Sequence, residues 1–242
     1  MASKTIEATS TMSLRTPRYR LLTLLVVVPL LGALIVGVAM RWNAAERDRE
    51  SISVLRGLLF DVGYDEYRGD EWDHRFNPSV NDYYGAQIEY VSVSKDTIRG
   101  PIDERVLHAI CRLSSLRHLN LKGMSLSGLS LEPLNELPCL ETIALDDTDT
   151  ADEQIAGLGN QSALKCLRLS GTSITDQSLV SVARFSQLAS LDVSNTAITD
   201  GGLRELENCD QLEIVWVSGT QTTEAGLDQL RSALPGCEVV SH

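Results

Sequence analysis

The chain has 242 residues, of which 43% are hydrophobic and only 5% are aromatic. That hydrophobic content excludes a disordered protein, and the scarcity of aromatic residues predicts an aliphatic core of the kind found in small repeated layers. Residues 43–242 hold 16 basic and 32 acidic residues, a net charge of −16, because the first 42 residues contain five of the 21 basic and one of the 33 acidic residues. An acidic body repels phosphate, so nucleic-acid binding is not expected.

A membrane anchor is predicted at Leu21–Met40, a run of twenty residues without a charge. A helix of that length spans roughly 30 Å of hydrocarbon. The alternative is a cleaved signal peptide, but the run is too long and Trp42–Ala45 makes a poor cleavage site. Arg15, Arg18 and Arg20 crowd the near side of the run. This favours a single-pass anchor with a cytoplasmic N-terminal tail and an extracytoplasmic body, and contact with the lipid bilayer through the run.

The segment 41–87 is predicted to connect the anchor to the body. Asn43–Leu59 is rich in helix formers and should continue as a juxtamembrane helix. Asp61–Asp73 carries six acidic residues and raises the possibility of calcium binding, but their spacing does not fit an EF-hand loop. A solvated acidic loop is the favoured interpretation.

Five units follow at an unbroken spacing of 24 residues, and they determine the predicted fold. They begin at Leu116, Leu140, Leu164, Leu188 and Leu212 and read LRHLNLKGM, LETIALDDT, LKCLRLSGT, LASLDVSNT and LEIVWVSGT. Positions 4 and 6 of each unit should point inward from a short parallel strand, while the residues between them point outward. Position 9 is threonine in four units, and its hydroxyl can satisfy backbone groups that leave the sheet.

Each unit should continue into a short helix. Position 11 is apolar at Leu126, Ile174 and Ile198, and Thr175-Asp176 and Thr199-Asp200 are good helix-start sequences. Positions 16 and 19 are apolar, as helical spacing requires. The prediction is an α/β solenoid with parallel strands on the concave face and helices on the convex face.

Divergent units are predicted at both ends of the repeats. Ile88–Val93 reads as a strand and Asp103–Leu113 as a helix, and Leu230–Val240 supplies a helix stop at Pro235-Gly236 and a last short strand. The expected organisation is a basic cytoplasmic tail (1–20), a transmembrane helix (21–40), a connector (41–87) and a repeat domain (88–242), the last comprising a divergent first repeat (88–115), regular repeats (116–235) and a C-terminal close (236–242).

The units KCLRLSGTSITDQSLVSV and ASLDVSNTAITDGGLREL resemble leucine-rich repeats. They are most similar to the cysteine-containing and ribonuclease-inhibitor-like groups, although position 9 carries threonine where those groups have asparagine or cysteine. The overall plan is similar to that of small membrane-anchored bacterial leucine-rich-repeat proteins. The resemblance covers Ile88–Val240 and implies protein binding.

The candidate binding residues lie at strand positions 3, 5 and 7, which should face the concave surface. Trp216 is the strongest of them because Trp and Arg dominate the binding energy of many interfaces, and the alternative is that the C-terminal tail covers it. The candidates are His118, Asn120, Lys122, Asp146, Arg168, Asp192 and Trp216.

No catalytic, cofactor-binding or metal-binding residues are expected, and the protein is not expected to be an enzyme. The chain contains no GxSxG, P-loop, GxGxxG or HExxH motif, and its four histidines have no metal-ligand spacing. Cys166 should lie two strands, or roughly 10 Å, from His118, too far for a thiolate–base pair. The acidic run from Asp146 to Glu153 could bind a cation, but a solvated convex loop is favoured. Most of the five cysteines are expected to be small apolar fillers of the repeat layers rather than disulfide partners or zinc ligands.

The function predicted first is a membrane-anchored protein-interaction module whose partner the sequence does not name. One alternative is a substrate-recruiting adaptor of a ubiquitin-ligase-like complex, which would need an F-box-like helical module that the connector does not supply. The other is a structural envelope protein that self-associates through its repeats.

Overall fold

A computed structural model of the protein describes residues 51, 89–93, 102–159 and 161–241. The chain divides into two compact units, Met1–Asn43 and Ala44–His242, and all described residues belong to the second. The predicted transmembrane helix at 21–40 lies outside the described residues, as does the predicted connector at 41–87 apart from Ser51. Among the helices of the described part, none has the length and apolarity needed to cross a membrane.

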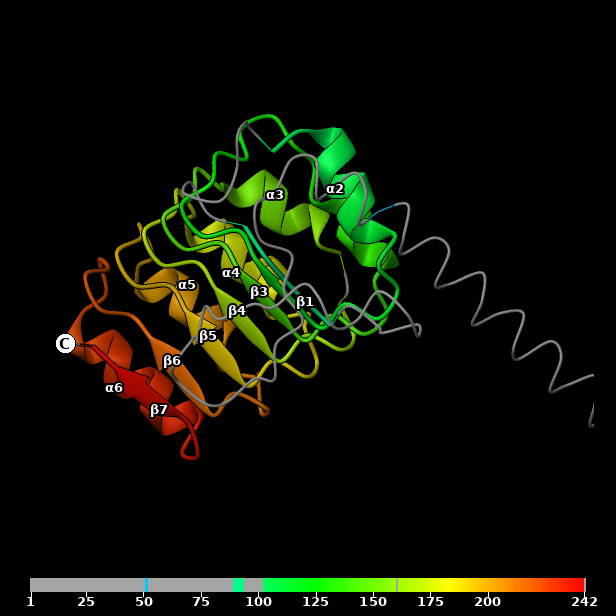
Figure 1. Ribbon diagram of the computed structural model, residues 1–242. Coiled ribbons are helices and arrows are strands. Elements are labelled where there is room, and N and C mark those ends of the chain that lie inside the picture. Colours follow the sequence, from blue (N-terminus) through cyan, green and yellow to red (C-terminus); the bar gives the residue numbers. More distant parts are fainter. Residues whose placement is uncertain (1–50, 52–88, 94–101, 160, 242) are drawn as a thin grey trace, which may run out of the picture. The chain divides into compact units, whose positions relative to one another are not determined.

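The described residues form one sheet of seven parallel strands that follow one another in chain order (Figure 1). Successive strands pair in register at a spacing of 28 residues for the first pair and 24 for each later pair, for example Leu119 with Ile143 and Ile143 with Leu167. The predicted α/β solenoid is therefore confirmed for this part of the chain. The strands are β1 (Tyr90–Ser92), β2 (His118–Asn120), β3 (Thr142–Ala144), β4 (Cys166–Arg168), β5 (Ser190–Asp192), β6 (Ile214–Trp216) and β7 (Glu238–Val240).

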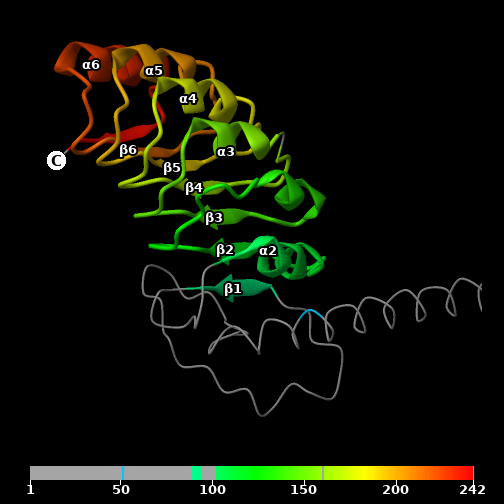
Figure 2. The ribbon, with the colours of Figure 1, turned by 90° about the horizontal axis from the view of Figure 1, so that it is seen from above.

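The helices that follow the strands lie side by side on one side of the sheet (Figure 2). The connecting helices are α2 (Glu104–Cys111), α3 (Asp152–Gly157), α4 (Asp176–Val182), α5 (Asp200–Glu205) and α6 (Glu224–Ala233). Between β2 and β3 the connection is instead the 3₁₀ helix η1 (Glu132–Glu136). Pro133 lies in its first turn, where it supplies no backbone N–H. In this repeat the expected helix is thus a 3₁₀ helix, which is more tightly wound than an α-helix.

The core lies between the sheet and the helices and is aliphatic, as the composition predicts. Positions 4 and 6 are fully enclosed in all five regular units, and so are the leucines at position 1. The apolar residues of position 11, such as Ile174, and of the helices, such as Leu179 and Leu203, close the opposite side of each layer. Every layer therefore buries its apolar residues against its neighbours, as a solenoid requires.

The threonines at position 9 hold the turn after each strand, as the sequence predicts. The hydroxyl of Thr172 donates to the carbonyl of Leu169 at 2.6 Å, and Thr148, Thr196 and Thr220 make the same bond to position 6 of their own units. Three of these four threonines are buried. In three of the four units this carbonyl also accepts the backbone N–H of the same threonine, so the hydroxyl adds a second donor that fixes the turn.

The residue before each of these turns adopts a left-handed backbone conformation. Position 8 has a φ between 56° and 70° in all five regular units, and it is occupied by Gly123, Asp147, Gly171, Asn195 and Gly219. Glycine, asparagine and aspartate tolerate this region best. In the first four of these units the backbone N–H of position 8 continues the ladder by donating to position 7 of the next unit, as Gly171 does to Ser194 at 2.8 Å.

Side chains on the helix side also join consecutive repeats. Asp152, Asp176 and Asp200, each the first residue of its helix, accept hydrogen bonds from the threonine that caps the following helix. We call the three contacts Asp152–Thr175, Asp176–Thr199 and Asp200–Thr223 the Asp–Thr ladder. Thr175 and Thr199 are confirmed as the predicted N-caps.

A different set of side chains joins the repeats of η1 and α3. Asn135 donates to the carbonyl of Gly157 at 2.9 Å, and Gln161 donates to the carbonyl of Leu134 at 2.9 Å. Asp149 accepts hydrogen bonds from the hydroxyl of Ser125 and the backbone of Leu126. Polar side chains therefore also join these two repeats. Their hydrogen bonds are made by residues of the loops and helix ends rather than by an N-cap threonine.

The five cysteines are all free. Cys111 and Cys237 are buried in the core, as expected for repeat fillers, and burial raises the pKa of the Cys111 thiol to about 12. Cys209 packs against the core from a partly buried position. Cys139 and Cys166 are only partly buried and lie outside the core, so the filler interpretation does not extend to them.

Candidate protein-binding face

The outward side chains of the strands form one continuous surface, which we call the strand face. It comprises positions 3, 5 and 7 of the regular units. The strands alternate a partly exposed, a buried and a partly exposed residue, except that Ala144 at position 5 of β3 is buried. Because equivalent positions pair in register, position 5 forms a row across the sheet that reads Asn120, Ala144, Arg168, Asp192 and Trp216.

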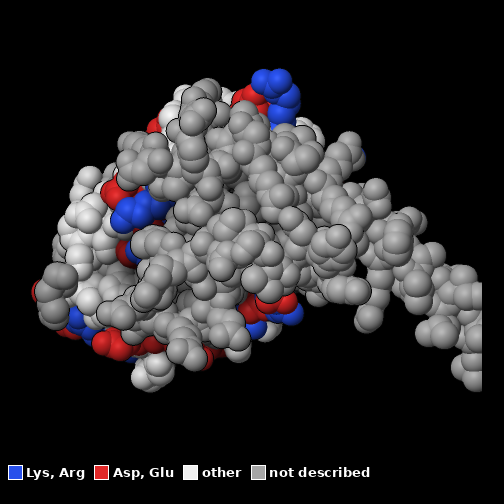
Figure 3. Space-filling view, in the orientation of Figure 1, with Lys and Arg blue, Asp and Glu red and all other residues white. Residues whose placement is uncertain are grey.

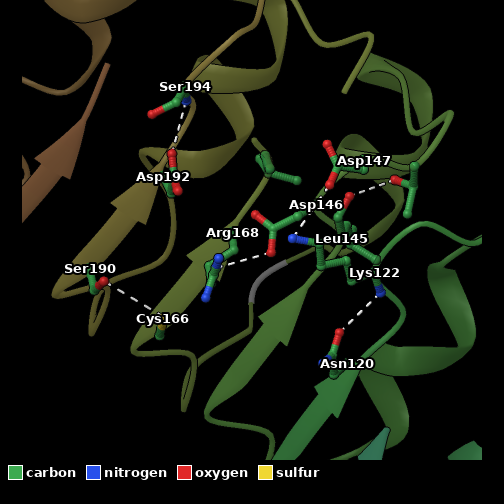
Figure 4. Close-up of polar contacts among 12 residues, drawn as sticks. Asn120, Lys122, Leu145, Asp146, Asp147, Cys166, Arg168, Ser190, Asp192 and Ser194 are labelled. Carbon is green, nitrogen blue, oxygen red and sulfur yellow. Dashed lines mark hydrogen bonds and ion pairs between the residues drawn. The ribbon is translucent and has the colours of Figure 1, made fainter. Parts of the chain in front are cut away.

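An ion pair lies at the centre of the strand face. Arg168 Nε lies 3.0 Å from Asp146 Oδ2, and the side chain of Arg168 is 37% exposed whereas that of Asp146 is 3% exposed (Figure 4). The other carboxylate oxygen, Asp146 Oδ1, is buried and accepts no hydrogen bond within the described part of the chain. Burial raises the pKa of Asp146, and the nearby Arg168 opposes that rise. Asp146 therefore positions Arg168 and is too enclosed to meet a partner directly.

Asp192 follows Arg168 in the row, but the two do not form an ion pair. Asp192 Oδ1 accepts the backbone N–H of Ser194 at 2.9 Å, which holds the carboxylate at the end of β5 (Figure 4). Within the described residues, no Lys or Arg nitrogen lies within ion-pair distance of this carboxylate. Arg168 has two acidic neighbours and pairs with Asp146.

Trp216 ends the row on β6. It lies in register between Asp192 on β5 and Val240 on β7, and its side chain is partly exposed. Over the described part of the chain, its indole makes no hydrogen bond and no ring contact. β7 therefore runs beside Trp216 without enclosing it.

The other three candidates lie on β2 or just after it. His118 Nδ1 is 3.0 Å from the hydroxyl of Thr142, and partial burial lowers the pKa of this histidine. Asn120 accepts the backbone N–H of Lys122 at 3.0 Å, and Lys122 Nζ lies 3.4 Å from Asp147 Oδ2. The structure thus brings the predicted residues onto one surface, with Trp216 at the end opposite His118.

A second charged row was not anticipated from the sequence. Position 2 of neighbouring units carries Arg117, Glu141 and Lys165, and Glu141 contacts both basic side chains, with Lys165 Nζ at 2.8 Å. Hydrogen bonding from Lys165 is the main reason that the pKa of Glu141 is lowered. The alternating signs at a spacing of 24 residues are the signal that could have revealed this row. Acidic and basic atoms of the described residues likewise lie beside one another in Figure 3.

The acidic run from Asp146 to Glu153 is only in part the solvated loop that the sequence favoured, because Asp147, Asp149 and Glu153 are exposed whereas Asp146 is buried. Asp146 faces the strand side and pairs with Arg168, Asp149 binds Ser125, and Asp152 binds the cap of α4. Consecutive acids point in different directions because the chain turns from strand to helix here. Among the described residues, no three His, Cys, Asp or Glu side chains are grouped so that they could hold a metal ion.

Cys166 and His118 lie on strands separated by β3, at the same register. Burial raises the pKa of the Cys166 thiol, whose Sγ lies 3.7 Å from the hydroxyl of Ser190. A thiol of raised pKa without an adjacent base is a poor nucleophile. The arrangement therefore does not favour nucleophilic chemistry at Cys166.

Comparison with known proteins gives matches in structure only. The sequence matches no family model and no curated protein. A leucine-rich-repeat protein of Leptospira interrogans is similar in structure at a TM-score of 0.39 and 20% identity, over 54% of this chain and 38% of that one. Internalin C2 of Listeria monocytogenes is similar at a TM-score of 0.41 and 22% identity, over 55% and 63%. The matched region spans less than two thirds of either structure.

The fold assignment rests on the chain's own geometry. One parallel strand per unit, a 24-residue register and leucines that share a single interior are the defining features of one class of solenoid. The described part of the chain therefore has the fold of a leucine-rich-repeat solenoid.

Proposed function

We propose that the protein is a membrane-anchored interaction module that binds a protein partner across the strand face. The observation that carries this proposal is the row Arg168, Asp192 and Trp216, which sets a cation, an anion and an indole side by side on adjacent strands. Packing of the repeats does not require this variety, because positions 4 and 6 provide the core with aliphatic residues alone. Trp and Arg are the side chains enriched at the centres of protein interfaces.

Site-specific crosslinking in cells would test this proposal. A photoreactive amino acid would be placed at Ile214, which lies two residues from Trp216 on the strand face, and separately at Val180, which is 43% exposed on α4. We expect crosslinks to a distinct protein from position 214 and none from position 180. Adding Trp216→Ala to the Ile214 variant should abolish the crosslink.

Other crosslinking results would redirect the proposal. Crosslinks from position 214 to a second copy of the chain would favour the self-associating envelope protein instead. Equal crosslinking from both positions, insensitive to Trp216→Ala, would contradict a specific strand-face interaction.

The anchored part of the proposal rests on Leu21–Met40 and on the arginines that precede it. A reporter enzyme that is active only outside the cytoplasm, fused after His242, should be active. Replacing Leu30 and Leu31 with arginine should release the protein from membranes that have been washed at alkaline pH. A reporter active only inside the cytoplasm would reverse the proposed orientation.

A further inference from the structure

We infer that Asp192 and Trp216 together bind a Lys or Arg side chain of the protein partner, an inference that rests on the proposed function. The starting point is the charge pairing of the strand face. Its two strong cations are already engaged, Arg168 with Asp146 at 3.0 Å and Lys122 with Asp147 at 3.4 Å. The carboxylate of Asp192 also lies on this face, but it has no ion-pair partner among the described residues.

The carboxylate of Asp192 is held in place but not saturated. Its Oδ1 accepts the backbone N–H of Ser194 at 2.9 Å, and its Oδ2 accepts no hydrogen bond from any residue of the described chain. In Figure 4 a dashed line joins Arg168 to Asp146, and none joins Arg168 to Asp192. A fixed anion with an open acceptor can receive a charge-assisted hydrogen bond at little cost in side-chain entropy.

The indole of Trp216 supplies the second half of the site. Asp192 and Trp216 pair in register on β5 and β6, so their side chains leave the sheet about 5 Å apart. A cation placed there can contact the carboxylate and the negative face of the indole ring at once. On the far side of Trp216 lies Val240, which would meet the aliphatic part of a Lys or Arg side chain.

The surroundings select against other ligands. Residues 43–242 carry a net charge of −16, which favours an approaching cation and repels phosphate. A divalent metal needs several oxygen ligands, whereas no three acidic, His or Cys side chains of the described residues converge. A side-chain cation needs only one carboxylate and one ring. The occupant to which the geometry points is therefore a basic residue of a polypeptide.

A peptide library displayed on phage and selected against the full-length protein in detergent micelles would test this inference. Selected peptides should share an Arg or Lys at one fixed position. Each would then be synthesised with citrulline, the neutral counterpart of arginine, at that position. We expect a loss of affinity of about tenfold for the wild-type protein and of no more than about twofold for Asp192→Asn.

Matched variants separate the site from the general acidity of the chain. Asp192→Asn keeps an oxygen that can accept the Ser194 N–H and removes only the charge. Glu213→Gln makes the same change on an exposed residue one position before β6, and should leave the citrulline effect at its wild-type size. Trp216→Leu keeps an apolar side chain on the strand and should weaken the selected peptides by about tenfold.

The outcomes distinguish this inference from the proposed function. One outcome is that Trp216→Leu weakens peptide binding while the citrulline substitution lowers the affinity of the wild type and of Asp192→Asn by the same factor. In that case the basic-residue site is wrong, but the strand face remains an interface. If the selected peptides show no dependence on Trp216, both fail. The basic-residue site is supported if the factor by which citrulline lowers peptide affinity is about fivefold smaller for Asp192→Asn than for the wild type.

Discussion

Asp176 holds Thr199 at two atoms, accepting its backbone N–H on Oδ1 at 2.8 Å and its hydroxyl on Oδ2 at 2.6 Å. Thr199 in turn caps α5 by accepting the N–H of Gly201 at 3.1 Å. One carboxylate on α4 therefore determines where the next helix begins. The same relationship links Asp152 to Thr175 and Asp200 to Thr223.

Asp176→Ala is expected to lower the free energy of unfolding by about 1–2 kcal/mol, because two donors on Thr199 lose a charged acceptor. Urea unfolding followed by circular dichroism would measure the change. Asp210→Ala is the control, since Asp210 is an exposed turn residue for which the described residues offer no polar partner. Equal effects of the two substitutions would show that Asp176 contributes only its charge.

Gly226→Ala is expected to destabilise the protein although alanine is the better helix former. A Cβ at this position of α6 would collide with Oδ1 of Asp200 and lie 2.9 Å from the Asp200 Cβ, so Asp200 would have to leave Thr223. We expect a net loss of about 1–2 kcal/mol after the gain in helix propensity. Gly236→Ala, whose Cβ would meet nothing within 4 Å, should change the midpoint of thermal unfolding little. A stabilised Gly226→Ala protein would contradict the close contact.

Acid should weaken the Asp–Thr ladder. Hydrogen bonds from the backbone and hydroxyl of Thr223 lower the pKa of Asp200 in the folded protein. A carboxyl whose pKa is lower in the folded than in the unfolded chain stabilises the fold above its ordinary pKa, and that contribution is lost as the pH falls through the folded value. The free energy of unfolding, measured between pH 6 and about pH 2, should therefore fall less steeply for Asp200→Asn than for the wild type. If the free energies of unfolding of the two proteins change in parallel with pH, Asp200 does not contribute to the loss of stability in acid.

The ion pair between Arg168 and Asp146 should respond asymmetrically to substitution. Arg168→Met leaves a buried carboxylate without its cation and should cost about 2 kcal/mol, less than a fully buried pair because Arg168 is 37% exposed. Asp146→Asn leaves a guanidinium that water can reach and should cost less than about 1 kcal/mol. The double variant should recover most of the loss, which chemical unfolding of the three proteins would show.

The pH dependence of Arg168→Met should run opposite to that of the ladder. Burial raises the pKa of Asp146, so the folded state binds this proton more tightly than the unfolded chain does. The stability linked to this group is present at low pH and is lost as the pH rises through the raised pKa. Without Arg168 the pKa of Asp146 should rise further, so acidification toward pH 5 should stabilise the variant relative to the wild type. No relative gain at low pH would indicate that water already reaches the carboxylate.

The sequence predicts the layers of this fold well because one chemical requirement repeats at a fixed spacing. Leucine at position 1 and aliphatic residues at positions 4 and 6 must all reach the same interior, and the structure confirms this for every regular unit. The hydroxyl of position 9 was also predictable, since a turn leaving a sheet needs a donor. The left-handed residue at position 8 was missed, although the series Gly, Asp, Gly, Asn, Gly contains its signal.

The partners of the charged residues could not be predicted in the same way. Arg168 has Asp192 at its own register and Asp146 at the end of the previous strand, and only the burial of Asp146 shows which one it binds. The Asp–Thr ladder joins residues 23 apart through side chains of adjacent helices. Its signal is the recurrence of Thr-Asp, which predicts capping within one helix but does not reveal a contact between two helices.

The Asp–Thr ladder also gives the solenoid a direction. Each aspartate reaches toward the C-terminus, and α6 begins with Glu224, which has no following repeat to hold within the described chain and pairs with Arg231 of its own helix at 3.5 Å. A repeat inserted between α4 and α5 would need only Thr at its cap and Asp immediately after it to be bonded on both sides. A Thr-Asp pair at the start of each helix is therefore enough to link one repeat to the next. Repeats could be added to or removed from this solenoid one at a time without breaking the Asp–Thr ladder.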